Sequence, residues 1–349
     1  MNKPQVRITW MDRFLSLPKK IVILAWASSL CFVVILTIVV MEHIHRTEVK
    51  GYLAEKHLEL GREMREGLTV TFEDYIKEYQ EAIRLRPNWA EAHYELGKAL
   101  KENVAGDPVK AIHEFREAIR LKPGYDEAHY ILARALEDEG KKEEAEKEYR
   151  ETIRLNPNHY DAHRIFGNML EDQGRKDEAV REYREAIRID PKDSWCHRFL
   201  GRLLYEKGEC KEAEVEYREA LKGKEVWEAD PNWGLALALQ CQGKYEEAEK
   251  QYLETVKQQP KWGRDAYFHL AECYALWGKK EKAIESLRMV VNKGYGDWYT
   301  MEKDKSLNNL RDDPRFKTLA RVVKKRWENK VLKGPEGSLG KYGGPPYNR

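Results

Sequence analysis

A repeat of about 34 residues fills the middle of this chain and restricts its fold more than any other feature. Two clear copies run from Asp126 to Pro157 and from Tyr160 to Pro191. The residues that close four copies lie 36, 34 and 34 positions apart, at Pro87, Pro123, Pro157 and Pro191. A period of this size is typical of stacked helical hairpins. Residues 54–293 are therefore predicted to form about seven helix-turn-helix units.

Each copy places small and large residues at fixed positions. The eighth position of the first helix is small in every copy: Gly61, Gly97, Ala133, Gly167, Gly201, Ala236 and Ala271. In the second helix an alanine is followed one turn later by a large side chain, at Phe115, Tyr149, Tyr183, Tyr217, Tyr252 and Leu287. Residues one turn apart share a helix face, so we expect this face to interlock with the first helix. The stop between the helices is expected at Gly140, Gly174, Gly208, Gly243 and Gly278.

This pattern resembles the tetratricopeptide repeat family, whose motif has Leu-Gly, Tyr, Ala, an aromatic residue, Ala and Pro at these offsets. The resemblance covers roughly two-thirds of the chain, and the copy at 54–87 is degenerate. It implies an all-α fold, a superhelical solenoid of helix pairs. It also implies a concave face that binds peptides or protein surfaces.

The family turns positions two, five, nine and twelve of each first helix toward its groove. Aromatic residues and arginine are favoured at protein interfaces. They support a binding hypothesis for ten residues: Tyr94, Lys98, Tyr130, Arg134, Arg164, Asn168, Arg198, Arg202, Trp233 and Phe268. Leu237 is expected to join Trp233 and Phe268 in an exposed apolar extension. The alternative is a solvated groove, in which position-two carboxylates neutralise the bases: Glu91, Glu127 and Asp161.

Histidine recurs at the fourth position of four copies, as His93, His129, His163 and His197. Neighbouring helices lie about 8–10 Å apart, whereas Zn–N bonds are about 2.0–2.1 Å long. Equivalent histidines in successive units are therefore expected to pack, and no metal site is predicted.

The cysteines also form no paired motif; they are Cys31, Cys196, Cys210, Cys241 and Cys273. We expect small buried residues rather than a disulfide framework. Phosphate-binding loops and the common catalytic motifs are missing from the sequence. The chain is therefore not expected to be an enzyme, and no catalytic residue, cofactor or small-molecule substrate is predicted.

A basic N-terminal tail, residues 1–20, precedes an uncharged run at residues 21–41. At about 1.5 Å per residue this run reaches about 30 Å, enough to cross a bilayer. The alternative is a cleaved signal peptide, whose hydrophobic region is only about 7–15 residues and ends at a small-x-small site. We expect an uncleaved transmembrane helix, followed by a juxtamembrane linker at 42–53.

Lysine and arginine number five in residues 1–20 and three in the twenty residues after Met41. This bias favours a cytoplasmic N-terminus and extracytoplasmic repeats. The expected location is the cytoplasmic membrane of a bacterium or archaeon, as a single-pass protein.

The region after the repeats, residues 294–333, is predicted to cap the solenoid, because a terminal repeat needs a cover. It contains a DPRF element, found after the last repeat in many bacterial members of the resembled family. An apolar stripe recurs at helical spacing: Phe316, Leu319, Ala320, Val323, Trp327 and Val331. The outer side of this helix is strongly basic, which also suggests contact with anionic lipid or a partner. Residues 334–349 are expected to form an extended tail rich in Gly, Pro and Tyr.

Two functions are consistent with these features. The first is a membrane-anchored scaffold or assembly factor, which binds partner proteins in its groove. The second is a permanent accessory subunit of a multi-protein membrane complex, for example an energy-converting one. Nucleic acid is not an expected partner, because the region between residues 20 and 315 carries a net charge of −10 within a chain of net +2.

Overall fold

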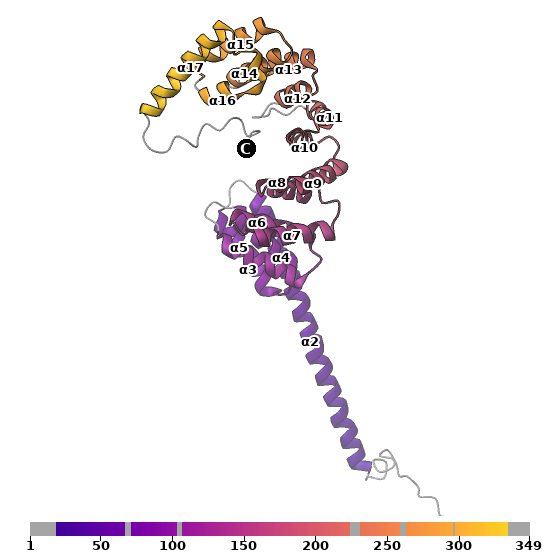
Figure 1. Ribbon diagram of the computed structural model, residues 1–349. Helices are drawn as coiled ribbons and strands as arrows, with labels where there is room; N and C mark the ends of the chain where they lie inside the picture. The colour runs from indigo at the N-terminus through magenta and orange to yellow at the C-terminus, as the bar shows by residue number, and fades with distance from the viewer. Residues whose placement is uncertain are drawn as a thin grey trace, which may run out of the picture. The chain divides into compact units, whose positions relative to one another are not determined.

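The computed structural model describes the backbone of residues 19–66, 71–102, 107–223, 231–258, 263–295 and 297–333, and side chains between residues 36 and 329 in those ranges. Its described elements are all helices (Figure 1). They are α2 (Lys19–Glu66), α3 (Phe72–Leu85), α4 (Ala90–Glu102), α5 (Pro108–Leu121), α6 (Asp126–Asp138), α7 (Lys142–Leu155), α8 (Tyr160–Asp172), α9 (Lys176–Ile189), α10 (Ser194–Glu206), α11 (Cys210–Ala220), α12 (Pro231–Cys241), α13 (Tyr245–Gln258), α14 (Gly263–Leu276), α15 (Lys280–Asn292), α16 (Trp298–Lys303), the 3-10 helix η2 (Lys305–Leu310) and α17 (Pro314–Lys333).

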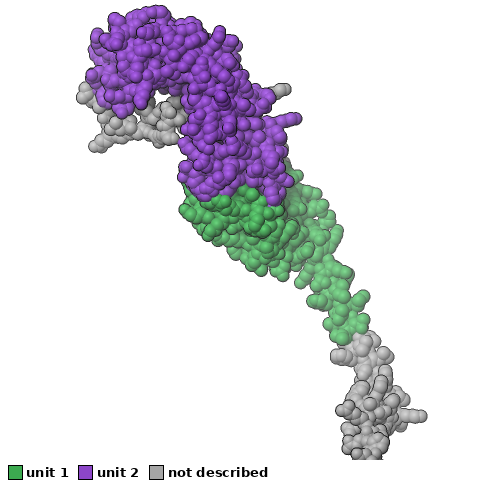
Figure 2. Space-filling model, turned by 45° about the vertical axis from the view of Figure 1, so that its right-hand side comes forward, with its two compact units in different colours: residues 1–155 green, residues 156–349 purple. Residues whose placement is uncertain are grey.

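The chain divides into two compact units, residues 1–155 and 156–349, which Figure 2 colours separately. In unit 1 the C-terminal part of α2 packs on α3, α4 on α5, and α6 on α7. In unit 2 the pairs are α8 with α9, α10 with α11, α12 with α13, and α14 with α15. The described residues thus contain seven helical hairpins, and the predicted all-helical repeat fold is confirmed.

A close fit between a glycine and an aromatic ring joins the two helices of a hairpin. A methyl group built on Gly167 would lie 2.7 Å from Cε1 of Tyr183, and one on Gly97 would lie 2.7 Å from Cε1 of Phe115. Both rings are fully buried. The predicted interlocking of small and large residues is therefore confirmed, and at these positions the second helix approaches too closely for any side chain on the first.

Each predicted helix stop is also confirmed. Glycines at the turn between the helices have φ angles between +73° and +83° in five hairpins, at Gly140, Gly174, Gly208, Gly243 and Gly278. Residues with a Cβ atom rarely adopt this left-handed conformation. In the first of these turns the amide of Lys141 donates to the carbonyl of Leu136 at 2.8 Å, which caps the helix end.

The four repeated histidines all make the same two hydrogen bonds. In His129, Nδ1 lies 2.6 Å from a carboxylate oxygen of Glu148, and Nε2 lies 3.2 Å from the carbonyl oxygen of Pro123. The other three are His93 with Glu114 and Pro87, His163 with Glu182 and Pro157, and His197 with Glu216 and Pro191. We call this arrangement the histidine clasp. It ties the first helix to the second helix and to the turn that precedes the hairpin.

The clasp favours the charged imidazolium, because both ring nitrogens face acceptors and only the doubly protonated ring donates from both. Burial alone would lower the pKa of His93, His129 and His197, but the hydrogen bonds to glutamate and to the proline carbonyl outweigh burial and raise it. The repeated histidines therefore pack and bond within their own hairpins. In the part of the chain that the structure describes, they join no group of three metal-ligating residues.

The expectation that the cysteines are all small packing residues is wrong for one pair. Cys210, at the start of α11, and Cys241, at the end of α12, form a disulfide, with Cα atoms 6.2 Å apart. Consecutive antiparallel helices bring these two positions side by side, although 31 residues separate them in sequence. Cys196 and Cys273 are buried free thiols, as expected, and the side chain of Cys31 lies outside the described residues.

None of the helices offers, within the described residues, a stretch both long and apolar enough to cross a bilayer. The side chains of residues 21–35, most of the predicted membrane segment, lie outside that description. The backbone of residues 21–41 belongs to the continuous helix α2. The membrane anchor and its orientation stay predictions.

The elements after the last hairpin pack apolar side chains against it. Leu307 and Leu310 of η2 are fully buried, and Phe316 and Val323 of α17 are almost fully buried. Arg315 bridges the carboxylates of Glu281 and Asp313 and thereby joins the start of α17 to α15. Trp327 of the predicted stripe is 38% exposed, and the side chain of Val331 lies outside the described residues. The tail at 334–349 lies outside the described residues.

The histidine clasp predicts a pH dependence of stability. The pKa of His129 is higher in the folded state than the 6.5 of an unfolded histidine. The clasp therefore stabilises the folded chain fully below pH 6.5, and this stabilisation is lost as the pH rises through the folded-state pKa. We expect His129→Gln to lower the free energy of unfolding by about 1–3 kcal/mol at pH 6, with a smaller loss at pH 9. Urea unfolding at both pH values measures this, with the exposed His113→Gln as the matched control. An equal loss at both pH values would contradict the clasp.

Candidate functional site

The ten residues of the binding hypothesis divide between the two units, and each set is described by itself. In unit 1, Lys98 lies 5.3 Å above the ring of Tyr94, and Arg134 lies 6.0 Å from the ring of Tyr130. Each pair is one turn apart on one helix, α4 or α6. Both tyrosine rings are buried, and burial raises the pKa of Tyr94 well above its ordinary value. Here the bases cover the rings, and the rings are not open contact surfaces.

In unit 2 the side chains of α8 and α10 gather into one group. Trp195 lies against Phe199 with ring centroids 3.8 Å apart. The guanidinium groups of Arg198 and Arg202 lie 4.0 Å and 5.3 Å from the ring of Phe199, and that of Arg164 lies 5.3 Å from the ring of Trp195. We call these five residues the arginine–aromatic cluster. Arginines over aromatic faces are held by cation–π attraction.

Two members of this cluster, Trp195 and Phe199, were not among the predicted site residues. Trp195 occupies position two of its copy, where three other copies carry Glu91, Glu127 or Asp161. An aromatic residue at an otherwise acidic position was the signal available in the sequence. Both rings are partly exposed, whereas most apolar side chains around them are buried.

Carboxylates already bind some of the predicted groove bases. Arg202 forms ion pairs with Glu171 and Glu206, and its side chain is only 11% exposed. Arg164 pairs with Asp161 at 2.9 Å. The alternative of a neutralised groove is thus correct for these two arginines, although Arg202 uses glutamates near the helix ends rather than position two. Asn168 is engaged too, because its Oδ1 accepts a hydrogen bond from the Tyr183 hydroxyl at 2.6 Å.

The predicted exposed apolar extension is wrong. Trp233, Leu237 and Phe268 are each less than a tenth exposed. The ring of Phe268 stacks on Tyr295 at 5.1 Å, and that of Trp233 lies 5.4 Å from the ring of His269. The elements that follow in the chain cover these rings, so they belong to the core of unit 2.

A buried acidic pair lies beside these rings. Burial raises the pKa of Glu272 to about 7, while His269, whose Nδ1 is 2.7 Å from a Glu272 oxygen, opposes the rise. Burial would also raise the pKa of Asp304, but hydrogen bonds from Glu272 and Ser306 outweigh it and keep Asp304 ionised. The carboxyls of Glu272 and Asp304 therefore influence each other across the contact between α14 and the start of η2. This pair is internal and makes no catalytic arrangement that we recognise.

Comparison with known families decides the classification. One model of the tetratricopeptide repeat matches residues 104–157, 130–194 and 234–296. A second model of the same repeat matches residues 72–104. Together these matches cover more than half of the chain. The chain belongs to the tetratricopeptide repeat family.

Several solved structures resemble this tetratricopeptide repeat protein. PilF of Pseudomonas aeruginosa superposes with a TM-score of 0.51 at 16% identity, over 60% of this chain and 94% of that chain. A MamA structure gives a TM-score of 0.40 at 28% identity, over 43% of this chain and 87% of that chain. YrrB, described as having an unusual peptide-binding site, gives a TM-score of 0.47 at 16% identity, over 52% of this chain and 92% of that chain. A comparison with curated protein sequences finds no match. The PilF likeness supports the fold alone.

Proposed function

We propose that the chain is a membrane-anchored scaffold or assembly factor, and that the arginine–aromatic cluster of unit 2 contacts its partner proteins. The observation that carries this proposal is the closely packed, partly exposed pair Trp195 and Phe199 among three arginines. Tryptophan and arginine dominate the energetics of protein interfaces. Their fixed positions reduce the entropy lost on binding. The family's usual role in protein interaction supports a binding role rather than catalysis.

Membrane attachment is part of this proposal. The end of the apolar run that the structure describes is uncovered by protein: Leu36, Ile38, Val39, Val40 and Met41 are each 46–63% exposed. A contiguous exposed apolar surface indicates a protein or membrane contact. The whole run at 21–41 has the length and composition of a transmembrane helix.

We place the repeats on the outer side of the cytoplasmic membrane. The excess of lysine and arginine before residue 21 supports this orientation. The disulfide between Cys210 and Cys241 is independent support, because disulfides persist in oxidising compartments and are rare in the cytosol.

A permanent complex subunit is the second candidate. It predicts a detergent-stable complex of fixed stoichiometry, whereas the scaffold predicts a chain that purifies largely free of its partners. Solubilised purification distinguishes the two roles.

Site-specific photo-crosslinking tests the binding surface. A photoreactive amino acid at position 195, in α10, is expected to give discrete crosslinks to other proteins in native membranes. The same amino acid at Arg184, an exposed position on the second helix α9, is the matched control and is expected to give few. Arg202 is not a suitable position for the photoreactive amino acid, because its replacement would leave two partly buried glutamates without their ion-pair partner. Equal crosslinking at both positions would contradict the assignment.

Thiol trapping tests the orientation. Cells are alkylated at lysis without reductant, and peptides from the full chain are analysed by mass spectrometry. We expect Cys210 and Cys241 to be recovered as a linked pair, and a Cys210→Ser variant to leave Cys241 alkylated. Because Cys241 is exposed, alkylation of both cysteines in the unaltered chain would show a reducing compartment and overturn the proposed topology.

A further inference from the structure

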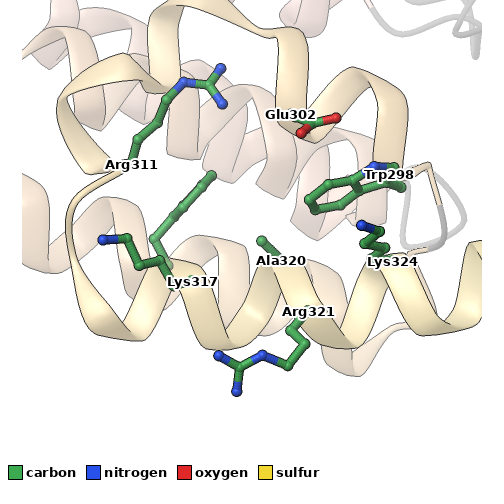
Figure 3. A pocket seen from close by; sticks show the side chains of 8 residues that line it. Trp298, Glu302, Arg311, Lys317, Ala320, Arg321 and Lys324 are labelled. Carbon is green, nitrogen blue, oxygen red and sulfur yellow. The ribbon is translucent and has the colours of Figure 1, made fainter.

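A hollow of about 370 Å³ lies between α16, η2 and α17, outside the arginine–aromatic cluster. Phe316 and Ala320, both less than a tenth exposed, form its apolar floor, and Trp298 forms one wall. Figure 3 shows Trp298 and Lys324 together at one end of the hollow, and Arg311 and Lys317 at the other.

Positive charge surrounds this apolar floor. Arg311, Lys317, Arg321 and Lys324 line the hollow together with one carboxylate, Glu302. Arg311 is held in place by Asn308, whose Oδ1 accepts a hydrogen bond at 2.9 Å, and by the carbonyl of Asp304 at 3.0 Å. Since these two acceptors are uncharged, the guanidinium keeps its positive charge available to a ligand.

The bases of the hollow differ from those of the repeats. Arg164 and Arg202 have carboxylate partners at position two or near the helix ends. Among the described residues, by contrast, no carboxylate lies within ion-pair distance of Lys324 or Arg311, and Lys317 has only the fully exposed Asp312 at 3.9 Å. Unpaired positive charge beside a hollow with an apolar floor complements an anionic ligand that also carries an apolar group.

The shape of the site favours a peptide over a bilayer. A flat anionic membrane surface would not reach the recessed floor that the nearly buried Phe316 and Ala320 form. A hollow with an apolar floor instead receives a single projecting side chain. Lys317 and Lys324 are seven residues apart on α17, or about 10 Å at about 1.5 Å per residue. An extended peptide covers this distance in about three to four residues, and its side chains alternate between two faces, so that residues two or four positions apart point the same way.

We propose that this hollow binds an extended acidic segment of a partner protein, in which two acidic residues four positions apart flank a bulky apolar side chain midway between them, so that all three side chains share one face. The apolar side chain enters over Phe316 and Ala320. One acidic group meets Lys324, and the other meets Arg311 and Lys317. This is a second contact site, and it does not depend on the assignment of the arginine–aromatic cluster.

Peptide binding to the full chain in detergent tests this site. The probe is a fluorescein-labelled Gly/Ser peptide with Glu-Ser-Phe-Ser-Glu at its centre, and its binding is measured by fluorescence anisotropy at low salt. We expect Lys317→Gln with Lys324→Gln, and separately Trp298→Ala, to weaken binding about tenfold or more. Lys305→Gln with Lys325→Gln removes the same charge outside the hollow and is expected to change affinity less than about twofold.

Four results would overturn the proposal. One is equal affinity for a Gln-Ser-Phe-Ser-Gln or Glu-Ser-Gly-Ser-Glu peptide. A second is equal weakening by the two double variants, which would indicate attraction to net charge alone. A third is binding of the chain to phosphatidylglycerol vesicles through Lys317 and Lys324 with no binding of the peptide, which would make the site a lipid contact. The fourth is loss of peptide binding in Trp195→Ala, which would place the peptide on the arginine–aromatic cluster. If the peptide does not bind at the hollow, the crosslinking experiment at position 195 still tests the arginine–aromatic cluster independently.

Discussion

In four of the described hairpins a glycine on the first helix fits against a buried ring of the second helix, and this contact holds the two helices together. Gly97 with Phe115 and Gly167 with Tyr183 show the contact in both units. A single hairpin is too thin to bury these rings, so each depends on its neighbours, as in other repeat proteins. The histidine clasp adds a polar connection at the same level of the hairpin, between helix, helix and turn.

This packing also decides which surface remains for other molecules. In unit 2 the first helix α10 carries Trp195 and Phe199, which stay partly exposed although each ring lies 6.0 Å from the buried ring of Tyr183. Ion pairs within the repeats neutralise bases such as Arg202, which leaves flat aromatic and guanidinium surfaces rather than free charge. The cap has the opposite character, because Arg311 and Lys324 keep their charge beside an apolar hollow. The two proposed sites therefore suit different partner chemistries.

The sequence was sufficient for most features that repeat, although the hydrogen-bond partners of the repeated histidines came only from the structure. The hairpins, the glycine turns and the fit of small to large residues follow from periodicity, because each copy obeys the same local constraints. The features that occur once were not predictable in this way. Phe268 occupies a position that faces the groove in the family. Here Tyr295, which follows the last hairpin, stacks on its ring. The pairing of Cys210 with Cys241 depends on which helix ends meet, and the spacing of the two residues matches no motif.

Substitution of the interlocking glycine tests the central claim most directly. Gly167→Ala places a methyl group 2.7 Å from the buried ring of Tyr183, whereas Gly51→Ala in α2 meets no atom within 4 Å. Thermal and urea unfolding of both variants is the measurement. We predict that Gly167→Ala lowers the free energy of unfolding by about 1–3 kcal/mol through overpacking, while Gly51→Ala leaves stability unchanged or raises it by up to about 1 kcal/mol through helix propensity. If Gly167→Ala stabilises the chain as much as Gly51→Ala does, the helices do not interlock as described.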